Sequence, residues 1–177
     1  MNERKVAARH SPTRIGTPFS IRLTRLLLWA AVGIWSVWVG GQVFNAMMVV
    51  PIWSVNPPET LRAYANLARE ARGLPFFIIF TTLWPLLLSS VACLTSRGAA
   101  WSERRWIVLF AAIALGVSLA LVGWLVPTIA GLFAGQYTTD AEGARAFRAW
   151  ERGNVVRLGI ESINLLIGLR ALIGSYR

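Results

Sequence analysis

The stretch AFRAWERGNVVRLGIESINLLIGLRALIG, residues 146–174, decides the fold because it joins two properties that rarely occur together. From Val155 onward it is long and apolar enough to cross a bilayer, whose hydrocarbon core takes about 20 residues of helix. The same segment carries Arg157, Glu161 and Asn164. A charged side chain in hydrocarbon costs at least about 2.5–3.5 kcal/mol, so such residues normally face a bundle interior or a wet cavity. The stretch therefore predicts a membrane helix with one polar face.

The composition of the whole chain favours the same class. Of its 177 residues, 55% are hydrophobic and 15% are charged, whereas a soluble domain carries about 25% charged residues. Four segments are long and apolar enough to span, at about 26–50, 75–95, 106–133 and 155–173. The first continues past Gly40 and Gly41 without a cleavage site, so we interpret it as retained. We expect an all-α integral membrane four-helix bundle over residues 23–177, preceded by a disordered basic tail over residues 1–22.

The formal net charge of +10 is unevenly distributed. The tail before the first span, the connection between spans two and three, and the C-terminus are basic, whereas the other two connections mix both signs. The positive-inside rule then predicts a multi-pass protein of the cell membrane with both termini in the cytoplasm. The basic tail is interpreted as a topology signal and a contact for anionic membrane lipids. Nucleic acid is not expected as a partner, because no aromatic-basic module accompanies the charge.

Prolines and turn residues divide the rest of the chain. Leu61 and Tyr64 fall at helical spacing among charges, which predicts an amphipathic helix over residues 58–72 lying on the outer surface. A second short interfacial helix is expected in the last connection, capped by Asp140. Pro85 in the middle of span two and Pro127 in span three predict kinks that open a cavity. The alternative is that membrane helices simply tolerate proline.

A stripe of residues on the last span is the candidate site. The spacings 4, 3, 4, 3 and 4 put its members on one helix face: Trp150, Asn154, Arg157, Glu161, Asn164 and Gly168. Arg157 and Glu161 are four residues apart and can pair. Helix alternation brings further polar and aromatic residues to the same outer half of the bundle: Gln42, Asn45, Thr81, Thr82, Trp84, Trp124 and Thr128.

A purely structural role is the alternative for these residues. Asn, Gln, Ser and Thr link membrane helices by hydrogen bonds, and we assign Gln42, Thr81 and Thr82 to that role when each is taken singly. Such links do not require two full charges, so Asn154, Arg157 and Glu161 are interpreted as functional. The remaining tryptophans are interpreted as interface anchors and packing residues: Trp29, Trp35, Trp38, Trp53, Trp101 and Trp106.

Three features together resemble a known family. They are GGQVFNAMMVVP at residues 40–51, the proline-bearing second span, and the pattern W-x3-N-x2-R formed by Trp150, Asn154 and Arg157. The chain from about Leu26 to Gly174 is similar to the anthrone oxygenase-like family of small four-helix membrane proteins. The resemblance implies oxidation of an anthrone, or a similar aromatic polyketide of secondary metabolism, to a quinone. Molecular oxygen would be the co-substrate and no cofactor or metal would take part.

The resemblance also implies roles for residues. Arg157 and Asn154 would stabilise an enolate oxygen, as preorganised donors do in a site of low dielectric. Glu161, assigned from its position rather than from the resemblance, would be the base. Substrate contacts would come from the rest of the set: Trp150, Asn45, Gln42, Trp84, Trp124 and Asn164.

Other functions fit the same residues. The stripe could hold a lipid or a partner helix in a non-catalytic accessory protein, or Glu161 could serve as acid and base in a membrane isomerase or cyclase. A transporter is less favoured, because no inverted repeat is visible and the polar residues stop halfway across the membrane. Homo-oligomerisation stays open. Cys93 is the single cysteine and His10 the single histidine, so a protein-bound metal is not expected.

Overall fold

The computed structural model describes residues 18–56, 59–70, 82–137 and 139–176. Within these ranges every regular element is helical and the helices pack into a bundle, which confirms the predicted all-α class. The elements are α1 (Pro18–Phe44), the π-helical segment η1 (Asn45–Val49), α2 (Val50–Trp53), α3 (Glu59–Glu70), α5 (Leu83–Thr95), α6 (Trp101–Ala120), the π-helical segment η2 (Leu121–Leu125), α7 (Val126–Phe133) and α8 (Asp140–Gly174).

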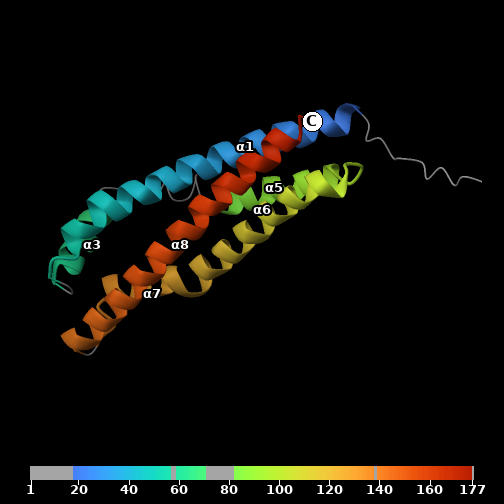
Figure 1. Cartoon of the computed structure of the whole chain (residues 1–177). Helices are drawn as coiled ribbons and strands as arrows, with labels where there is room; N and C mark the ends of the chain where they lie inside the picture. Colours follow the sequence, from blue (N-terminus) through green and yellow to red (C-terminus); the bar gives the residue numbers. More distant parts are fainter. Residues whose placement is uncertain (1–17, 57–58, 71–81, 138, 177) are drawn as a thin grey trace, which may run out of the picture.

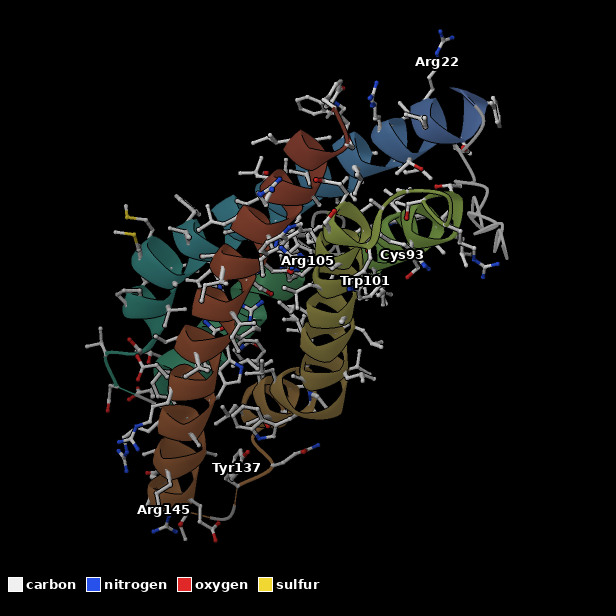
Figure 2. The ribbon with its side chains drawn as sticks, turned by 45° about the vertical axis from the view of Figure 1, so that its right-hand side comes forward. Arg22, Cys93, Trp101, Arg105, Tyr137 and Arg145 are labelled. Atoms are coloured by element: carbon white, nitrogen blue, oxygen red, sulfur yellow. The ribbon has the colours of Figure 1, made fainter. Side chains whose placement is uncertain are left out.

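Four helices form a closed ring of neighbours, in which α1 contacts α5, α5 contacts α6, α6 contacts α8, and α8 returns to α1. One end of the molecule, here called the terminal end, is formed by the start of α1, the end of α5, the start of α6 and the end of α8 (Figure 1). α3 and α7 lie toward the other end, with the first turns of α8 (Figure 1). Figure 2 shows Arg22 and Arg145 at opposite ends. Neighbouring helices therefore alternate in direction.

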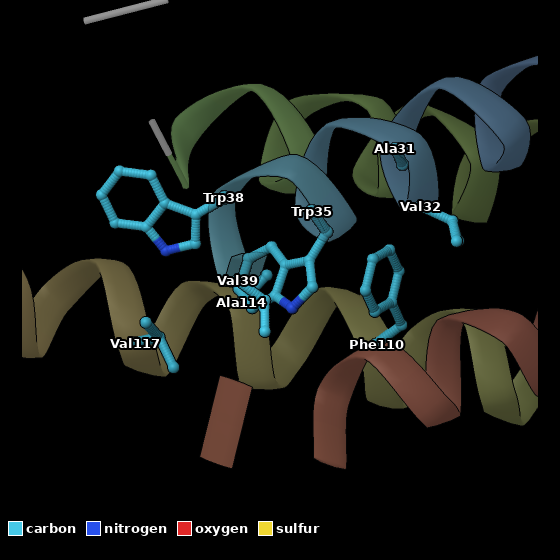
Figure 3. Close-up of a cluster of buried hydrophobic side chains, with 8 residues drawn as sticks. All are labelled: Ala31, Val32, Trp35, Trp38, Val39, Phe110, Ala114 and Val117. Atoms are coloured by element: carbon cyan, nitrogen blue, oxygen red, sulfur yellow. The ribbon is translucent and has the colours of Figure 1, made fainter. Parts of the chain in front are cut away.

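Buried side chains form three clusters along the bundle. The central cluster joins α1 to α6 across the ring (Figure 3). In it, the rings of Trp35 and Phe110 meet edge to face with centroids 5.8 Å apart, a favoured aromatic geometry. A second cluster at the terminal end lies around Leu28. A third, around Leu61 and Trp150, packs α3 onto η2, α7 and α8 at the opposite end.

Two long helices change their winding just before a proline. α1 passes into η1 before Pro51, and α6 passes into η2 before Pro127. A proline ring lacks an N–H donor and clashes with the carbonyl four residues earlier, and a π-helical turn inserts one residue that relieves this clash. The helices thus run on past their prolines. The helix widens locally into a π-helical turn and is not broken at the proline.

The last connection departs from the expected pattern. No separate short helix precedes the last span, because α8 is one continuous helix of 35 residues. Its N-cap is Thr139, whose side chain accepts from the Glu142 amide, so the expected cap at Asp140 is wrong by one residue. α7 ends where Gly135 adopts φ 66°, a left-handed conformation typical of helix ends. The helix continues through residues 143–155 because nothing there removes a backbone donor.

The structure also tests the helix predicted over residues 58–72 and the kink predicted at Pro85. The helix predicted over residues 58–72 is present as α3, Glu59–Glu70; its predicted first residue and its last two lie outside the described residues. Pro85 is the third residue of α5 rather than the middle of a described helix. A proline in the first turn costs no hydrogen bond, so it produces no kink within α5. The first third of the predicted span two, residues 75–81 with Thr81 included, lies outside the described residues.

The surface of the bundle is apolar while its interior holds polar groups. Large side chains face outward along every long helix, among them Trp29, Leu119, Val156, Ile163 and Leu166. Gln42, Arg157 and Glu161 are buried. Two helical segments, Phe19–Ile52 and Trp101–Phe133, are long and apolar enough to cross a membrane, and Leu83–Thr95 is a shorter apolar helix. Charged groups buried in the interior, together with this many large apolar side chains on the surface, are unusual for a soluble protein.

Candidate functional site

The polar stripe of α8 faces into the bundle. Asn154 and Arg157 are 7% and 5% exposed, and Glu161 and Asn164 are completely buried. The apolar residues between them, Val155, Val156, Ile160 and Ile163, are exposed on the other side of the helix. The predicted helical face is therefore present, and it points at α1 and α6, the two neighbours of α8 in the ring.

Arg157 connects the side chains of two helices. Its Nη1 donates to Glu161 Oε1 at 2.7 Å, so these two side chains form the ion pair that their spacing allows. Its Nη2 donates to Asn154 Oδ1 and to Gln42 Oε1, each at 2.8 Å. Gln42 comes from the last turns of α1, where helix alternation placed it. Hydrogen bonds that involve an ionised group are roughly twice as strong as neutral ones, so this cluster joins α1 firmly to α8.

Two tryptophans of α1 complete the surroundings of Glu161. Trp38 Nε1 donates to Glu161 Oε1 at 2.9 Å, and Trp35 Nε1 donates to the Glu161 backbone carbonyl at 2.9 Å. Both indoles are buried in the central cluster (Figure 3). The guanidinium carbon of Arg157 lies 6.0 Å from the centre of the Trp38 ring, at the outer limit of a cation–π contact.

These tryptophans correct the sequence interpretation. Their packing role holds, but as buried donors to Glu161 they are not interface anchors. The spacing of Trp35, Trp38 and Gln42, which is 3 and 4, puts all three on one face of α1. That spacing was the signal that could have found them. Indole donors usually find a partner when buried, and the last span offered a buried carboxylate.

Three buried polar atoms of the cluster have no hydrogen-bond partner within the described part of the chain. They are Glu161 Oε2, Arg157 Nε and Asn164 Oδ1. Asn164 does use its other polar atom, since Nδ2 donates to the Phe110 carbonyl at 3.3 Å. A buried polar atom left without a partner costs about 1–3 kcal/mol, and more when it is charged. The cluster therefore retains an acceptor on Glu161, an acceptor on Asn164 and a donor at Arg157 Nε.

The other predicted site residues lie around this cluster rather than in it. Trp150 is buried and stacks on Phe147, with ring centroids 6.2 Å apart, in the cluster under α3. Asn45 lies in η1 and is half-buried. Trp84 and Trp124 are 50% and 46% exposed on the outside of the bundle. The ring of Trp124 lies against Gly153, where a β-carbon would collide with it.

Two hydroxyl residues form a separate link. Thr82 and Ser118 are hydrogen-bonded at 2.8 Å between α5 and α6, and the Ser118 hydroxyl also lies 2.8 Å from the Ala114 carbonyl. Thr128 bonds the Trp124 carbonyl of its own helix at 2.7 Å. The hydrogen bond of Thr82 matches the interhelical role assigned to that residue. Within the described residues, no hydrogen bond joins Thr82 or Ser118 to Arg157 or Glu161.

Neither metal ligands nor known relatives add to this picture. Across residues 18–56, 59–70, 82–137 and 139–176, no group of three His, Cys, Asp or Glu side chains is arranged to hold a metal. The chain matches no protein-family model, and no curated protein or solved structure is significantly similar to it. The site is therefore described by its own chemistry: a buried Arg–Glu pair, two amides and two indole donors.

Proposed function

We propose that the protein is an integral membrane protein whose α1–α2, α5, α6–α7 and α8 belong to four spans. Support comes from the exposed apolar side chains described above, since lipid accepts outward apolar side chains that water would not. α8 is about 52 Å long at 1.5 Å per residue, which exceeds a hydrocarbon core of about 30 Å. Its first turns and α3 would lie at the outer membrane surface. The terminal end, with Arg22, Arg25 and Arg104, would lie at the cytoplasmic face.

Within this membrane domain, we infer that the cluster around Glu161 is the reaction site of an enzyme for a hydrophobic, aromatic or polyketide-like small molecule. The single observation that carries the inference is the buried carboxylate oxygen Glu161 Oε2, which has no partner within the described residues. Glu161 Oε1 is fixed by Arg157 and Trp38. A carboxylate aligned through one oxygen, with the other left as an acceptor, has the form of a general base.

The reaction class follows the resemblance to anthrone oxygenases. Removal of a proton from the activated carbon of an anthrone gives an enolate, which transfers one electron to molecular oxygen. Recombination forms a carbon–oxygen bond as a peroxide anion, and the proton held by Glu161 converts this anion to a hydroperoxide. The hydroperoxide then loses its remaining C–H proton and a hydroxide as water, which leaves the carbonyl of the quinone. One oxygen molecule is consumed and one water is released for each anthrone oxidised. Glu161 would take the first proton and return it to the peroxide.

The contacts refine the role expected for Arg157. Three of its five guanidinium N–H groups donate to side chains of the protein, one from Nη1 and two from Nη2, which leaves Nε–H and one N–H of Nη1 as donors. Arg157 would therefore act mainly by aligning Glu161, with Nε as a donor toward an enolate oxygen. Asn154 and Gln42 hold the guanidinium, and Trp38 holds the carboxylate.

Oxygen uptake with an anthrone tests the proposal. The detergent-solubilised protein is mixed with an anthrone in air, and both oxygen consumption and the quinone absorbance are followed. The wild type should exceed the rate of spontaneous oxidation. Glu161→Gln should lose about 10²–10⁴-fold in rate, the range that general-base catalysis contributes. The substitution is nearly isosteric, and its amide oxygen can still accept from Arg157 and Trp38.

Ser162→Ala is the matched control, because the Ser162 hydroxyl bonds only the Leu158 carbonyl of its own helix, at 2.9 Å. It should keep the wild-type rate. A Glu161→Gln variant that oxidises the anthrone as fast as the wild type would refute the assignment of the base. Proton exchange into a ketone without oxygen uptake would instead favour the isomerase or cyclase.

A second function is supported by a different observation. The polar side chains of the cluster form hydrogen bonds with Arg157 or with one another, so the cluster also links α1 to α8. These side chains are Gln42, Asn154, Glu161 and Trp38. In a non-catalytic membrane accessory protein this link alone would be the purpose of the charges. Replacing the pair with apolar residues would then leave the biological activity intact.

A further inference from the structure

A cavity of about 530 Å³ lies at the terminal end, far along α8 from the cluster around Glu161. It is open on one side and is lined by the first turns of α1, the end of α5, the start of α6 and the end of α8. This volume falls within the range of small-molecule sites. Ile21, Ile107 and Ala171 supply an apolar wall, and the hydroxyls of Ser102 and Ser175 supply part of a polar one.

Charged groups of both signs line this cavity. Arg25 and Arg104 carry the positive charges and Glu103 the negative one. No ion pair that involves Arg25, Glu103 or Arg104 is found within the described part of the chain. Glu103 Oε2 and Arg104 Nε are also buried without a hydrogen-bond partner there. Arg25 donates through Nε to the Ser175 carbonyl at 2.8 Å, which fixes its guanidinium at the rim.

The start of α6 adds to the positive side of the cavity. Its N-cap, Ala100, has no side chain that can accept from the first amides of the helix. The amino end of a helix carries a partial positive charge and attracts phosphate. Ala100 and Ser102 both line the cavity, so these amides lie beside Arg104. Phosphate is the anion that this combination suits best, because Arg and helix amides both recognise its oxygens.

We propose that this cavity binds the phosphoethanolamine head group of a phospholipid. The phosphate would lie against Arg25, Arg104 and the amino end of α6, and the primary ammonium would pair with Glu103. The acyl chains would leave along the apolar wall. A phosphate alone would add a second negative charge beside the Glu103 carboxylate, whereas a zwitterionic group also offers that carboxylate a cation. The proposal rests on the membrane placement above but not on the enzymatic activity.

Native mass spectrometry of the full chain in detergent tests the proposal. The protein is incubated with phosphatidylethanolamine, phosphatidylcholine or phosphatidylglycerol of identical acyl chains, and the lipid-bound fractions are compared. We expect phosphatidylethanolamine to be retained about tenfold over phosphatidylcholine, whose methylated ammonium cannot donate a hydrogen bond. Glu103→Gln should remove that preference while phosphatidylglycerol stays bound, which also shows that the variant is folded.

Controls separate recognition of the head group from general binding of lipid. Glu59→Gln changes an exposed carboxylate of α3 at the opposite end and should keep the preference. In the wild type, soluble phosphoethanolamine should compete for the site and phosphocholine should not. Equal retention of the three lipids, or a preference that survives Glu103→Gln, would overturn the proposal. Displacement of the lipid by inorganic phosphate alone would overturn it in favour of a free phosphate. A protein that stays monomeric in water without detergent would instead refute the membrane placement.

Discussion

At the scale of single residues, Glu161 lies at the centre of the buried polar cluster. Its carboxylate and its backbone carbonyl accept from two indoles of α1, and Arg157 approaches it from one turn earlier in α8. A buried ion pair is often no more stable than an apolar pair of similar volume, but breaking it leaves a buried charge uncompensated. Each contact to Glu161 should therefore be visible as a change in stability.

Trp38→Phe removes one of these donors and keeps an aromatic ring in the central cluster. We expect a loss of about 1–3 kcal/mol in the free energy of unfolding, as for a lost hydrogen bond to a charged group. Denaturant titration in detergent measures it. Trp29→Phe is the matched control, since Trp29 bonds Tyr176 at the exposed surface and should change the same free energy by less than about 0.5 kcal/mol. Equal effects of the two substitutions would contradict the role given to Trp38.

Arg157→Met tests the pair itself. Because it leaves the Glu161 carboxylate buried without its cation, we expect it to cost about 3–5 kcal/mol of stability. The double variant Arg157→Met with Glu161→Leu should recover most of that loss, since an apolar pair often replaces a buried ion pair without penalty. Thermal unfolding in detergent compares the two. A double variant as unstable as the single one would show that the charges were not coupled.

Many residues of this site, but not all of them, were predicted from the sequence. Helical spacing predicted that Asn154, Arg157 and Glu161 share a face, and helix alternation placed Gln42 beside them. Trp38 was missed because indoles are ordinary both at membrane interfaces and in cores, so its type alone did not indicate a donor. Trp84 and Trp124 are at the expected helices, yet their outward direction depends on the rotation of each helix, which spacing alone does not fix.

At the scale of elements, the bundle depends on close approach between α8 and its neighbours. Gly168 lies where a β-carbon would meet Phe110 at 3.0 Å and Val32 at 3.1 Å. Both neighbours are buried in the central cluster. Small residues at such crossings let membrane helices pack closely, so this glycine sets the distance among α1, α6 and α8.

Gly168→Leu should therefore overpack the crossing and destabilise the bundle by about 1–3 kcal/mol. Gly159→Leu is the control in the same helix, because a β-carbon there meets nothing within 4 Å. That variant should be neutral or slightly stabilising, since leucine favours helix over glycine by somewhat less than about 1 kcal/mol. The midpoint of thermal unfolding in detergent ranks the two variants, and the reverse order would contradict this packing.

Element boundaries show where sequence patterns lose precision. The apolar runs predicted the long helices, and the turn prolines and charges predicted α3. η1 and η2 were not predicted, because the π-helical response to Pro51 and Pro127 depends on whether the neighbouring helices hold the chain straight. The continuous α8 was missed for a related reason: a change from amphipathic to apolar residues suggested two helices, although no residue ends the first.

At the scale of the whole molecule, the proposed membrane placement rests on the large apolar side chains of the outer surface. Cysteine labelling tests it in a Cys93→Ala background. Ile163→Cys, on the exposed apolar side of α8, should resist a charged maleimide in intact membranes and react after denaturation. Arg145→Cys, at the opposite end of the molecule from Arg22 (Figure 2), should react when the reagent reaches that side. Fast labelling of Ile163→Cys in intact membranes would refute the placement of α8 in lipid.

The measurement that tests the central claim most directly is small-molecule extraction from the detergent-purified protein, compared between the wild type and Glu161→Gln. If the cluster around Glu161 is a ligand site, the wild type should copurify an aromatic or isoprenoid compound that Glu161→Gln loses while both proteins keep the same helical content. If both proteins carry only ordinary phospholipid in equal amounts, the buried charges serve to join α1 to α8 and the enzymatic function is contradicted.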